Sequence, residues 1–270
     1  MAIFIYLLFF SDYLAVNEIS VSGIENVQQD DIKNEIKSYL SGRFLDIVEK
    51  NNLIFIRSSF YEEDLARKFK KIDTVDVRRK FPNTLLVSIK ERKLAAIFSA
   101  GDRYFVLDDK GEAFEEINHN LPEYTNSSLA IIKDSGNSTI NPGDVILSQN
   151  YIFFLENAKK KIESELSINL NREFITPNRI SGDFRAVTQE NWSIYFNASL
   201  DAEKEVGMLK AVLDEKIPSN QRNNLEYIDL RSDNKVFYKF KEGSQEEITS
   251  EEDKKTEEQP KVEEKKKKKK

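Results

Sequence analysis

Cysteine is absent from this chain of 270 residues, which excludes disulfide bonds, thiolate metal ligands and cysteine nucleophiles. Histidine occurs once, as His119 in a polar stretch, so a Ser-His-Asp triad would depend on a residue with no nucleophile motif nearby. The nine glycines do not cluster into a phosphate-binding loop or a dinucleotide fingerprint. We therefore expect no catalytic residues, no metal site, no cofactor and no small-molecule substrate.

Positive charge is also in deficit, because the formal net charge is −6 and the pI is near 5.2. Binding to nucleic acid depends on a basic patch that displaces counterions, so we expect no nucleic-acid partner. Charged residues make up 33% of the chain and hydrophobic residues 39%, which is typical of a soluble body rather than a membrane bundle. A chain of this length can bury one large core or two modest ones.

The longest apolar run stands at the start of the chain, from Ala2 to Phe10, and Tyr13–Val16 continue it after Ser11 and Asp12. It is shorter than the roughly 20 residues that a spanning helix needs. It also lacks the basic start and the small-residue cleavage site of a signal peptide. Two interpretations stay open: the outer part of a truncated transmembrane helix, or a buried or interfacial helix.

Hydrophobic periodicity predicts the elements of the first half of the chain. The expected strands are 17–22, 74–80 and 84–92, and the expected helices are 28–40 and 60–71. Ser59 and Glu62 have the spacing of a capping box at the start of the second helix. The segment 43–52 is ambiguous, and its apolar residues would fit one or two helical turns.

The second half reads as strands interrupted by two helices. We expect strands at 94–99, 103–108, 112–116, 129–133, 172–175, 180–187, 192–197, 225–230 and 235–240, and helices at 151–170 and 200–217. Trp192, Ile194 and Phe196 share one face of their strand and are predicted to lie in the core. From residue 241 onward the chain is rich in Glu and Lys and ends in six lysines, so we expect a disordered tail that stays solvated or touches an anionic surface.

One stretch carries a family resemblance. The sequence Val-Asp-Val-Arg-Arg-Lys-Phe-Pro-Asn-Thr-Leu at 75–85 is followed by Ile-Lys-Glu-Arg at 89–92 and by Val-Leu-Asp-Asp-Lys-Gly-Glu-Ala-Phe at 106–114. In this order the motifs resemble the bacterial cell-division family FtsQ/DivIB, where they close a POTRA domain and open a β domain. The stretch Tyr227–Arg231 is similar to the family's C-terminal hairpin.

The resemblance implies an α+β fold in four parts. A membrane anchor would occupy residues 1–16, a β-α-α-β-β POTRA domain 17–92, a mixed β domain with flanking helices 93–240, and the disordered tail 241–270. It implies a non-enzymatic scaffold that is anchored in the cytoplasmic membrane by a single span. The bulk of the chain would lie on the extracytoplasmic side, at the division septum.

The resemblance also implies partners and contact residues. FtsB-like and FtsL-like proteins would bind, and through them the septal wall synthase, by adding a strand to the C-terminal edge of the sheet. The residues implied at that edge are Tyr227, Ser232, Asn234 and Phe240. Val236 and Tyr238, which share a face of the last strand with Phe240, are expected to join them. Ser232 departs from the aromatic residue often found in the family. A second contact region would include Arg78 and Pro82.

Other interpretations are open at this stage. The last strand could be an ordinary terminal strand, and Arg78 with Lys80 could simply line an outer sheet face. A POTRA-containing factor for outer-membrane or secretion assembly is a second functional class, although it would need a C-terminal barrel of many amphipathic strands. A wall-active enzyme is a third class, and the lack of a catalytic motif disfavours it.

Overall fold

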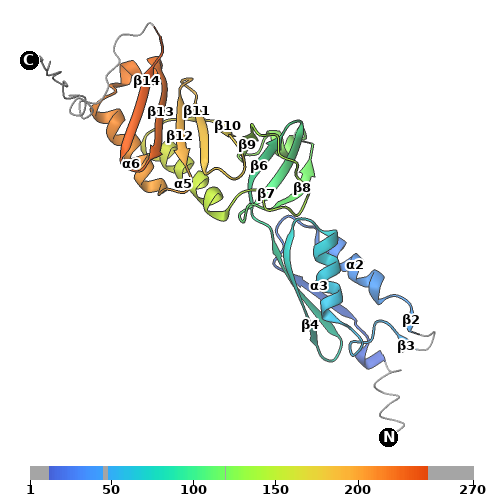
Figure 1. The fold of residues 1–270 in the computed structure, drawn as a ribbon. Helices are drawn as coiled ribbons and strands as arrows, with labels where there is room; N and C mark the ends of the chain where they lie inside the picture. The colour runs from blue at the N-terminus through green and yellow to red at the C-terminus, as the bar shows by residue number, and fades with distance from the viewer. Residues whose placement is uncertain (1–11, 45–47, 119, 243–270) are drawn as a thin grey trace, which may run out of the picture.

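The protein is described here by a computed structural model that covers residues 12–44, 48–118 and 120–242. These residues form two bodies in an elongated arrangement, with the N-terminal domain at one end and the last strand at the other (Figure 1). Each body has its own apolar core, one built from residues 32–89 and the other from residues 95–230. The predicted disordered tail lies almost wholly outside the described residues, as does His119.

The N-terminal domain is a three-stranded sheet covered on one face by two helices. Its strands are β1 (Glu18–Ser22), β4 (Ile72–Lys80) and β5 (Thr84–Glu91), in the order β1-β5-β4, with β1 parallel and β4 antiparallel to β5. The helices are α2 (Gln29–Leu40) and α3 (Ser58–Lys68). Alternate residues of β5, Leu85, Val87 and Ile89, are buried beneath them. The predicted β-α-α-β-β order is therefore confirmed.

Two local predictions in this domain need correction. The capping box is wrong, because Ser59 lies inside α3 and the helix starts after Arg57 without a side-chain cap. The Glu62 carboxylate instead accepts a hydrogen bond from the Val77 backbone N–H of β4 at 2.9 Å, so it ties the helix to the sheet. The ambiguous segment 43–52 contains a short hairpin, β2 (Arg43–Phe44) with β3 (Val48–Glu49), rather than helical turns.

The chain enters this domain before β1, and the entry is packed. A short 3-10 helix, η1 (Asp12–Leu14), is followed by a bridge between Ala15 and Asn52, and Leu14 and Ala15 are buried. Among the residues that the structure describes, no helix combines the length and apolar character needed to cross a bilayer. Most of the predicted anchor, residues 1–11, lies outside them.

The second domain is one nine-stranded mixed sheet in the order β14-β13-β12-β11-β10-β9-β6-β7-β8. Its strands are β6 (Leu94–Ala100), β7 (Arg103–Asp108), β8 (Ala113–Ile117), β9 (Ala130–Asp134), β10 (Leu170–Thr176), β11 (Asp183–Thr188), β12 (Ser193–Asn197), β13 (Leu225–Ser232) and β14 (Lys235–Phe240). The predicted α+β class is confirmed, and the mixed β domain proves to be a single large sheet.

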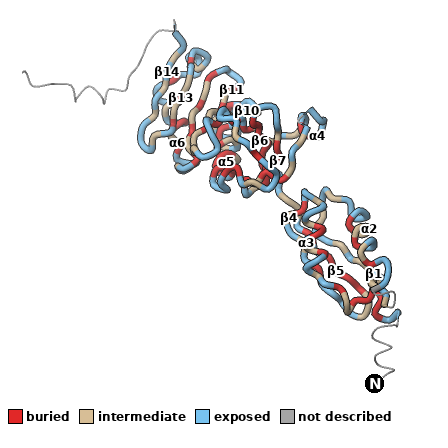
Figure 2. The backbone as a smooth tube through the Cα atoms, turned by 45° about the vertical axis from the view of Figure 1, so that its right-hand side comes forward, coloured by how far each residue is buried: buried red, intermediate tan, exposed pale blue. Residues whose placement is uncertain are grey.

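Helices α5 (Gln149–Glu165) and α6 (Ala202–Glu215) pack against this sheet and each other, whereas α4 (Pro122–Thr125) and the 3-10 helix η2 (Ser219–Asn224) lie in connections. Figure 2 shows buried residues along α5 and the strands beside it. The core is aromatic: the Phe184 ring lies 5.1–6.1 Å from the rings of Tyr151, Phe154, Phe174 and Phe196. Trp192, Ile194 and Phe196 are buried, as predicted.

The motifs that carry the family resemblance form the joint between the two domains. Glu91 accepts hydrogen bonds from the backbone N–H groups of residues 25–27 at 2.8–3.0 Å, which fixes the turn after β1. Arg92 reaches forward to Asp108 at 2.6 Å and Glu112 at 3.0 Å. Gly111 has φ +79°, and a Cβ there would lie 2.1 Å from the Leu147 carbonyl oxygen, so only glycine fits.

Replacing Glu91 should destabilise the N-terminal domain. Burial alone would raise its pKa, but hydrogen bonds from the backbone of Val27 and Glu25 and from Asn26 outweigh burial and hold the pKa below its usual value of 4.5. We expect Glu91→Ala to cost about 1.5–3 kcal/mol near neutral pH, as for hydrogen bonds to a charged group. The loss of stability can be measured by hydrogen exchange of the buried β5 amides.

The sign of the pH dependence follows from the lowered pKa. The stability contributed by Glu91 is present above pH 4.5 and is lost as the pH falls through the lower folded value. The difference in unfolding free energy between Glu91→Ala and the parent chain should therefore become smaller at acidic pH. Glu63→Ala on the exposed face of α3 is the control, and an equal loss there would contradict the assignment.

Candidate partner-binding edge

Strand β14 ends the nine-stranded sheet. It pairs with β13 in antiparallel register, from Ser232 opposite Lys235 to Leu225 opposite Phe240. No other strand of the described residues lies on its second side, and Figure 2 shows it at the outer margin of the domain. The rim that the sequence predicted is therefore open in the described part of the chain. One row of backbone N–H and C=O groups along β14 lacks a strand partner there.

The start of β8, at the opposite rim of the sheet, is covered by another segment, and no strand covers β14 in this way among the described residues. The segment before α5 runs beside β8: the Gly143 N–H donates to the Ala113 carbonyl oxygen at 2.7 Å, and the Ala113 N–H donates to the Asp144 carbonyl oxygen at 2.9 Å. Exposed strand edges invite pairing with other chains, and covering them prevents it. The contrast marks β14 as the open rim of this domain.

Alternate side chains of β14 face opposite sides of the sheet and differ in burial. Val236, Tyr238 and Phe240 are half-buried and pack against the core, with the Tyr238 and Phe240 rings 5.9 Å apart. Phe237 points to the other face and is 51% exposed. The three half-buried residues therefore hold the strand on the sheet, which leaves the backbone and the Phe237 face for an incoming strand.

The turn between β13 and β14 is held by α6. The Lys204 ammonium lies 2.7 Å from the Asp233 carboxylate and 3.2 Å from the Asn234 side-chain oxygen. Asn234, a predicted contact residue, is thus engaged within the chain, and Ser232 sits opposite Lys235 where the hairpin closes. The first turn of α6 positions the start of the open strand.

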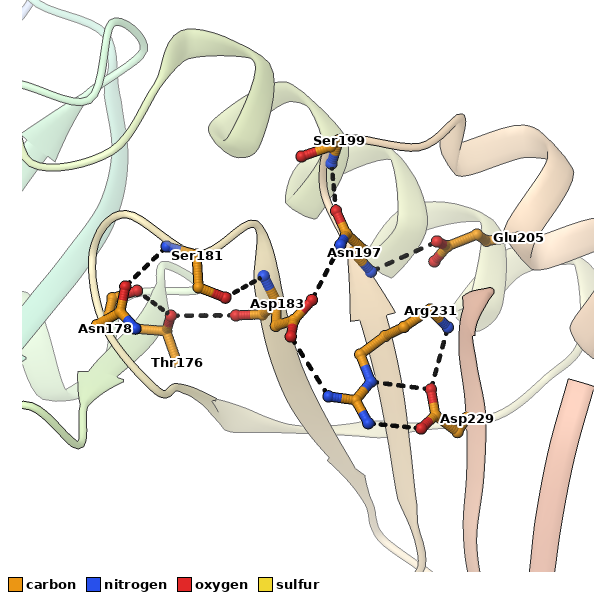
Figure 3. Close-up of polar contacts among 9 residues, drawn as sticks. All are labelled: Thr176, Asn178, Ser181, Asp183, Asn197, Ser199, Glu205, Asp229 and Arg231. Atoms are coloured by element: carbon orange, nitrogen blue, oxygen red, sulfur yellow. Dashed lines mark hydrogen bonds and ion pairs between the residues drawn. The ribbon is translucent and has the colours of Figure 1, made fainter. Parts of the chain in front are cut away.

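A polar cluster ties β13 to the next strands of the sheet, β12 and β11 (Figure 3). Arg231 donates to the Asp229 carboxylate at 2.6 and 2.9 Å and to Asp183 of β11 at 3.3 Å. Its guanidinium lies 5.1 Å from the centre of the Tyr195 ring on β12. The hydrogen bonds to Asp229 raise the pKa of Arg231, so this cation is permanent. Tyr227, another predicted contact residue, packs edge-on against Tyr195 at 5.7 Å.

Glu205 is the member of this cluster that sequence reasoning missed. It is fully buried on α6; one carboxylate oxygen is 3.4 Å from the Asn197 N–H, and the other has no partner in the described chain. Burial raises its pKa to about 8, and Asp183 and Asp229 push in the same direction. The sequence feature that could have revealed its burial is its position one turn before Leu209, on the apolar stripe of the helix.

The second predicted contact region lies at the far end of the molecule. Arg78 is exposed on the outer face of β4 and pairs with Asp76 at 2.8 Å. Arg79 points the opposite way and donates to the Ile54 carbonyl oxygen at 3.3 Å. Pro82 lies in the β4–β5 turn, and Figure 1 shows that end of the N-terminal domain remote from β14. The structure does not bring the two predicted regions together.

Comparison with known proteins supports the family resemblance. Residues 14–92 match the family described as POTRA domain, FtsQ-type. A relative named cell division protein DivIB, from Clostridium acetobutylicum, is 25% identical over 103 residues, which cover 38% of this chain and 37% of the relative. The chain thus matches little more than a third of that protein's length. Together the two matches confirm the resemblance predicted from the sequence.

Proposed function

From the premise that this chain is an FtsQ/DivIB-type protein, we propose that it is a non-enzymatic scaffold of the cell-division machinery. It is held in the cytoplasmic membrane by its N-terminal segment, with the two domains on the extracytoplasmic side at the septum. It binds an FtsB-like protein, together with an FtsL-like one, and through them reaches the septal wall synthase. Support comes from the POTRA match and from the name of the relative.

The open rim of β14 is the single observation that carries the binding mode. A partner segment in extended conformation would lie beside β14 and satisfy its outward backbone groups, which gives affinity without a preformed pocket. Side chains of the partner would meet Phe237 on one face and the row Val236, Tyr238 and Phe240 on the other. Selectivity would come from those two faces, because successive residues of a strand alternate between them.

Disulfide cross-linking can test this binding mode, because the chain has no cysteine and every introduced cysteine is its sole thiol. We expect single cysteines at Val236, Phe237, Tyr238 and Lys239 to form disulfides with single cysteines placed along the FtsB-like segment. Opposite residues of paired strands have Cβ atoms about 4.5–5.5 Å apart, so the yield should follow one register and alternate between faces. Mass spectrometry of the cross-linked full-length chains identifies the register.

The control is a cysteine at Glu115 on β8, at the opposite rim, which should give background yield. Equal cross-linking at Glu115, or a yield along β14 without alternation, would contradict strand addition. Cross-linking that instead concentrates at Arg78 would move the proposed contact to the N-terminal domain.

A further inference from the structure

One end of the N-terminal domain lies away from the second domain and contains the chain entry and the β4–β5 turn (Figure 1), with the end of α2 beside the chain entry; we call this end the N-terminal pole. The Asn17 N–H donates to the Asn83 carbonyl oxygen at 3.0 Å, and the Val16 N–H donates to that of Asn51 at 2.8 Å. The apolar run Ala2–Phe10 ends two residues before the first described residue, Asp12. The pole is thus where the most apolar segment of the sequence joins the folded domain.

A cavity of about 450 Å³ opens at this pole, between α2 and the start of β1. Lys33 and Lys37 line it from one face of the helix, a single turn apart, and Asn17 and Asn51 line it from the other side. Neither lysine forms an ion pair within the described chain, in contrast to Lys68, which pairs with Glu35 on the same helix. The cavity also contains Glu18, which accepts a hydrogen bond from the Thr84 hydroxyl at 3.2 Å.

Two exposed aromatic side chains stand close in sequence to residues that line the cavity or bond to its lining. The Tyr13 side chain is 69% exposed and that of Phe81 is 60% exposed, and both belong to segments of this pole. Arg79 and Lys80 directly precede Phe81 and add positive charge. Aromatic and basic side chains together are typical of protein surfaces at the water–lipid boundary.

We propose that this pole is a lipid-facing surface, on which Lys33 and Lys37 hold the phosphate of an anionic phospholipid headgroup. The ammonium groups supply the charge, and the Asn17 and Asn51 amides can donate to phosphate or glycerol oxygens. Tyr13 and Phe81 rest among the headgroups. The inference depends on the proposed membrane anchoring, and it adds a defined orientation of the N-terminal domain on the bilayer.

The test uses the full-length chain in vesicles of phosphatidylcholine, with or without phosphatidylglycerol. A cysteine at Asn34, exposed on α2, carries a fluorophore, and a lipid with a spin-labelled headgroup quenches it when the pole is close. We expect quenching to increase when phosphatidylglycerol is present. Each lysine should contribute roughly fivefold to that preference, so Lys33→Gln with Lys37→Gln should lower it about 25-fold.

Matched controls separate this inference from the anchoring. Lys70→Gln with Lys71→Gln removes the same charge after α3 and should leave the preference unchanged. If the chain binds both types of vesicle but its quenching does not depend on phosphatidylglycerol, the inference is overturned and the proposed anchoring stands. If the chain binds neither type of vesicle, the proposed anchoring is overturned. Competition by inorganic phosphate at low concentration would indicate a site for free anions and overturn the assignment to lipid.

Discussion

Phe184→Ala is expected to cost the second domain about 3–5 kcal/mol, the range measured for loss of a fully buried phenylalanine. Phe184 is 2% exposed and stands at the centre of the aromatic core, stacked on Phe196 at 5.1 Å and within 5.6 Å of Tyr151 and Phe154. These partners come from α5 and from β12. The cavity left by alanine would therefore loosen a helix and a strand together.

The measurement can be confined to the affected domain. The chain has one tryptophan, Trp192, which is fully buried in this core, so its fluorescence in a urea titration reports the second domain alone. Phe237→Ala is the control, because Phe237 belongs to the same sheet but is 51% exposed. We expect the control to change the free energy of unfolding by less than about 1 kcal/mol. Similar losses for both variants would show that Phe184 does not anchor the core.

Hydrogen exchange in the N-terminal domain gives a second check on the same variant. The two apolar cores share no residue. Phe184→Ala should therefore leave the exchange of the β5 amides unchanged. An equal acceleration of exchange in β5 would mean that the joint at Arg92 makes the two domains unfold as one unit.

Much of this fold could be predicted from the sequence, because its strands alternate and its helices carry apolar stripes. In β5 the buried residues Leu85, Val87 and Ile89 fall on every second position, and the structure confirms that strand to within one residue. The turn at Gly111 was also predictable, since a positive φ at that position requires glycine.

The remaining features depend on partners that are distant in sequence. Glu62 looked like a capping residue three positions after Ser59, yet its carboxylate binds β4, fifteen residues further on. The free edge at β14 was expected from the family resemblance, because strand order cannot be read from a pattern of alternation. The sequence around the lysines at the N-terminal pole did not indicate a binding site, because the cavity arises only when α2 packs beside β1.

Glu205→Gln is expected to stabilise the second domain at neutral and alkaline pH, which is unusual for a change at a fully buried residue. Its pKa of about 8 in the folded protein exceeds the ordinary 4.5, because burial disfavours the charge and Asp183 and Asp229 repel it. Arg231 cannot compensate, since its guanidinium is bound to those two aspartates. The folded state therefore holds a proton on Glu205 that the unfolded chain releases.

The sign of the pH dependence follows from that proton. Between about pH 4.5 and pH 8 the native state binds one more proton than the unfolded state at this site, so Glu205 lowers stability as the pH rises, by up to about 1.4 kcal/mol per pH unit. Glutamine keeps the shape without the titration. The advantage of Glu205→Gln over the parent chain should thus be small near pH 5 and reach a few kcal/mol near pH 8.

Urea titrations followed by Trp192 fluorescence across this pH range measure that difference. Glu203→Gln is the matched control, because Glu203 lies on the same helix turn but its side chain is 80% exposed and pairs with Lys161 at the surface. Its difference from the parent chain should stay nearly constant with pH, since exposed ion pairs contribute little. If Glu205→Gln gave an equally flat difference, Glu205 would be ionised in the folded protein. Its charge would then be compensated within the cluster that joins β11, β12 and β13 behind the open strand.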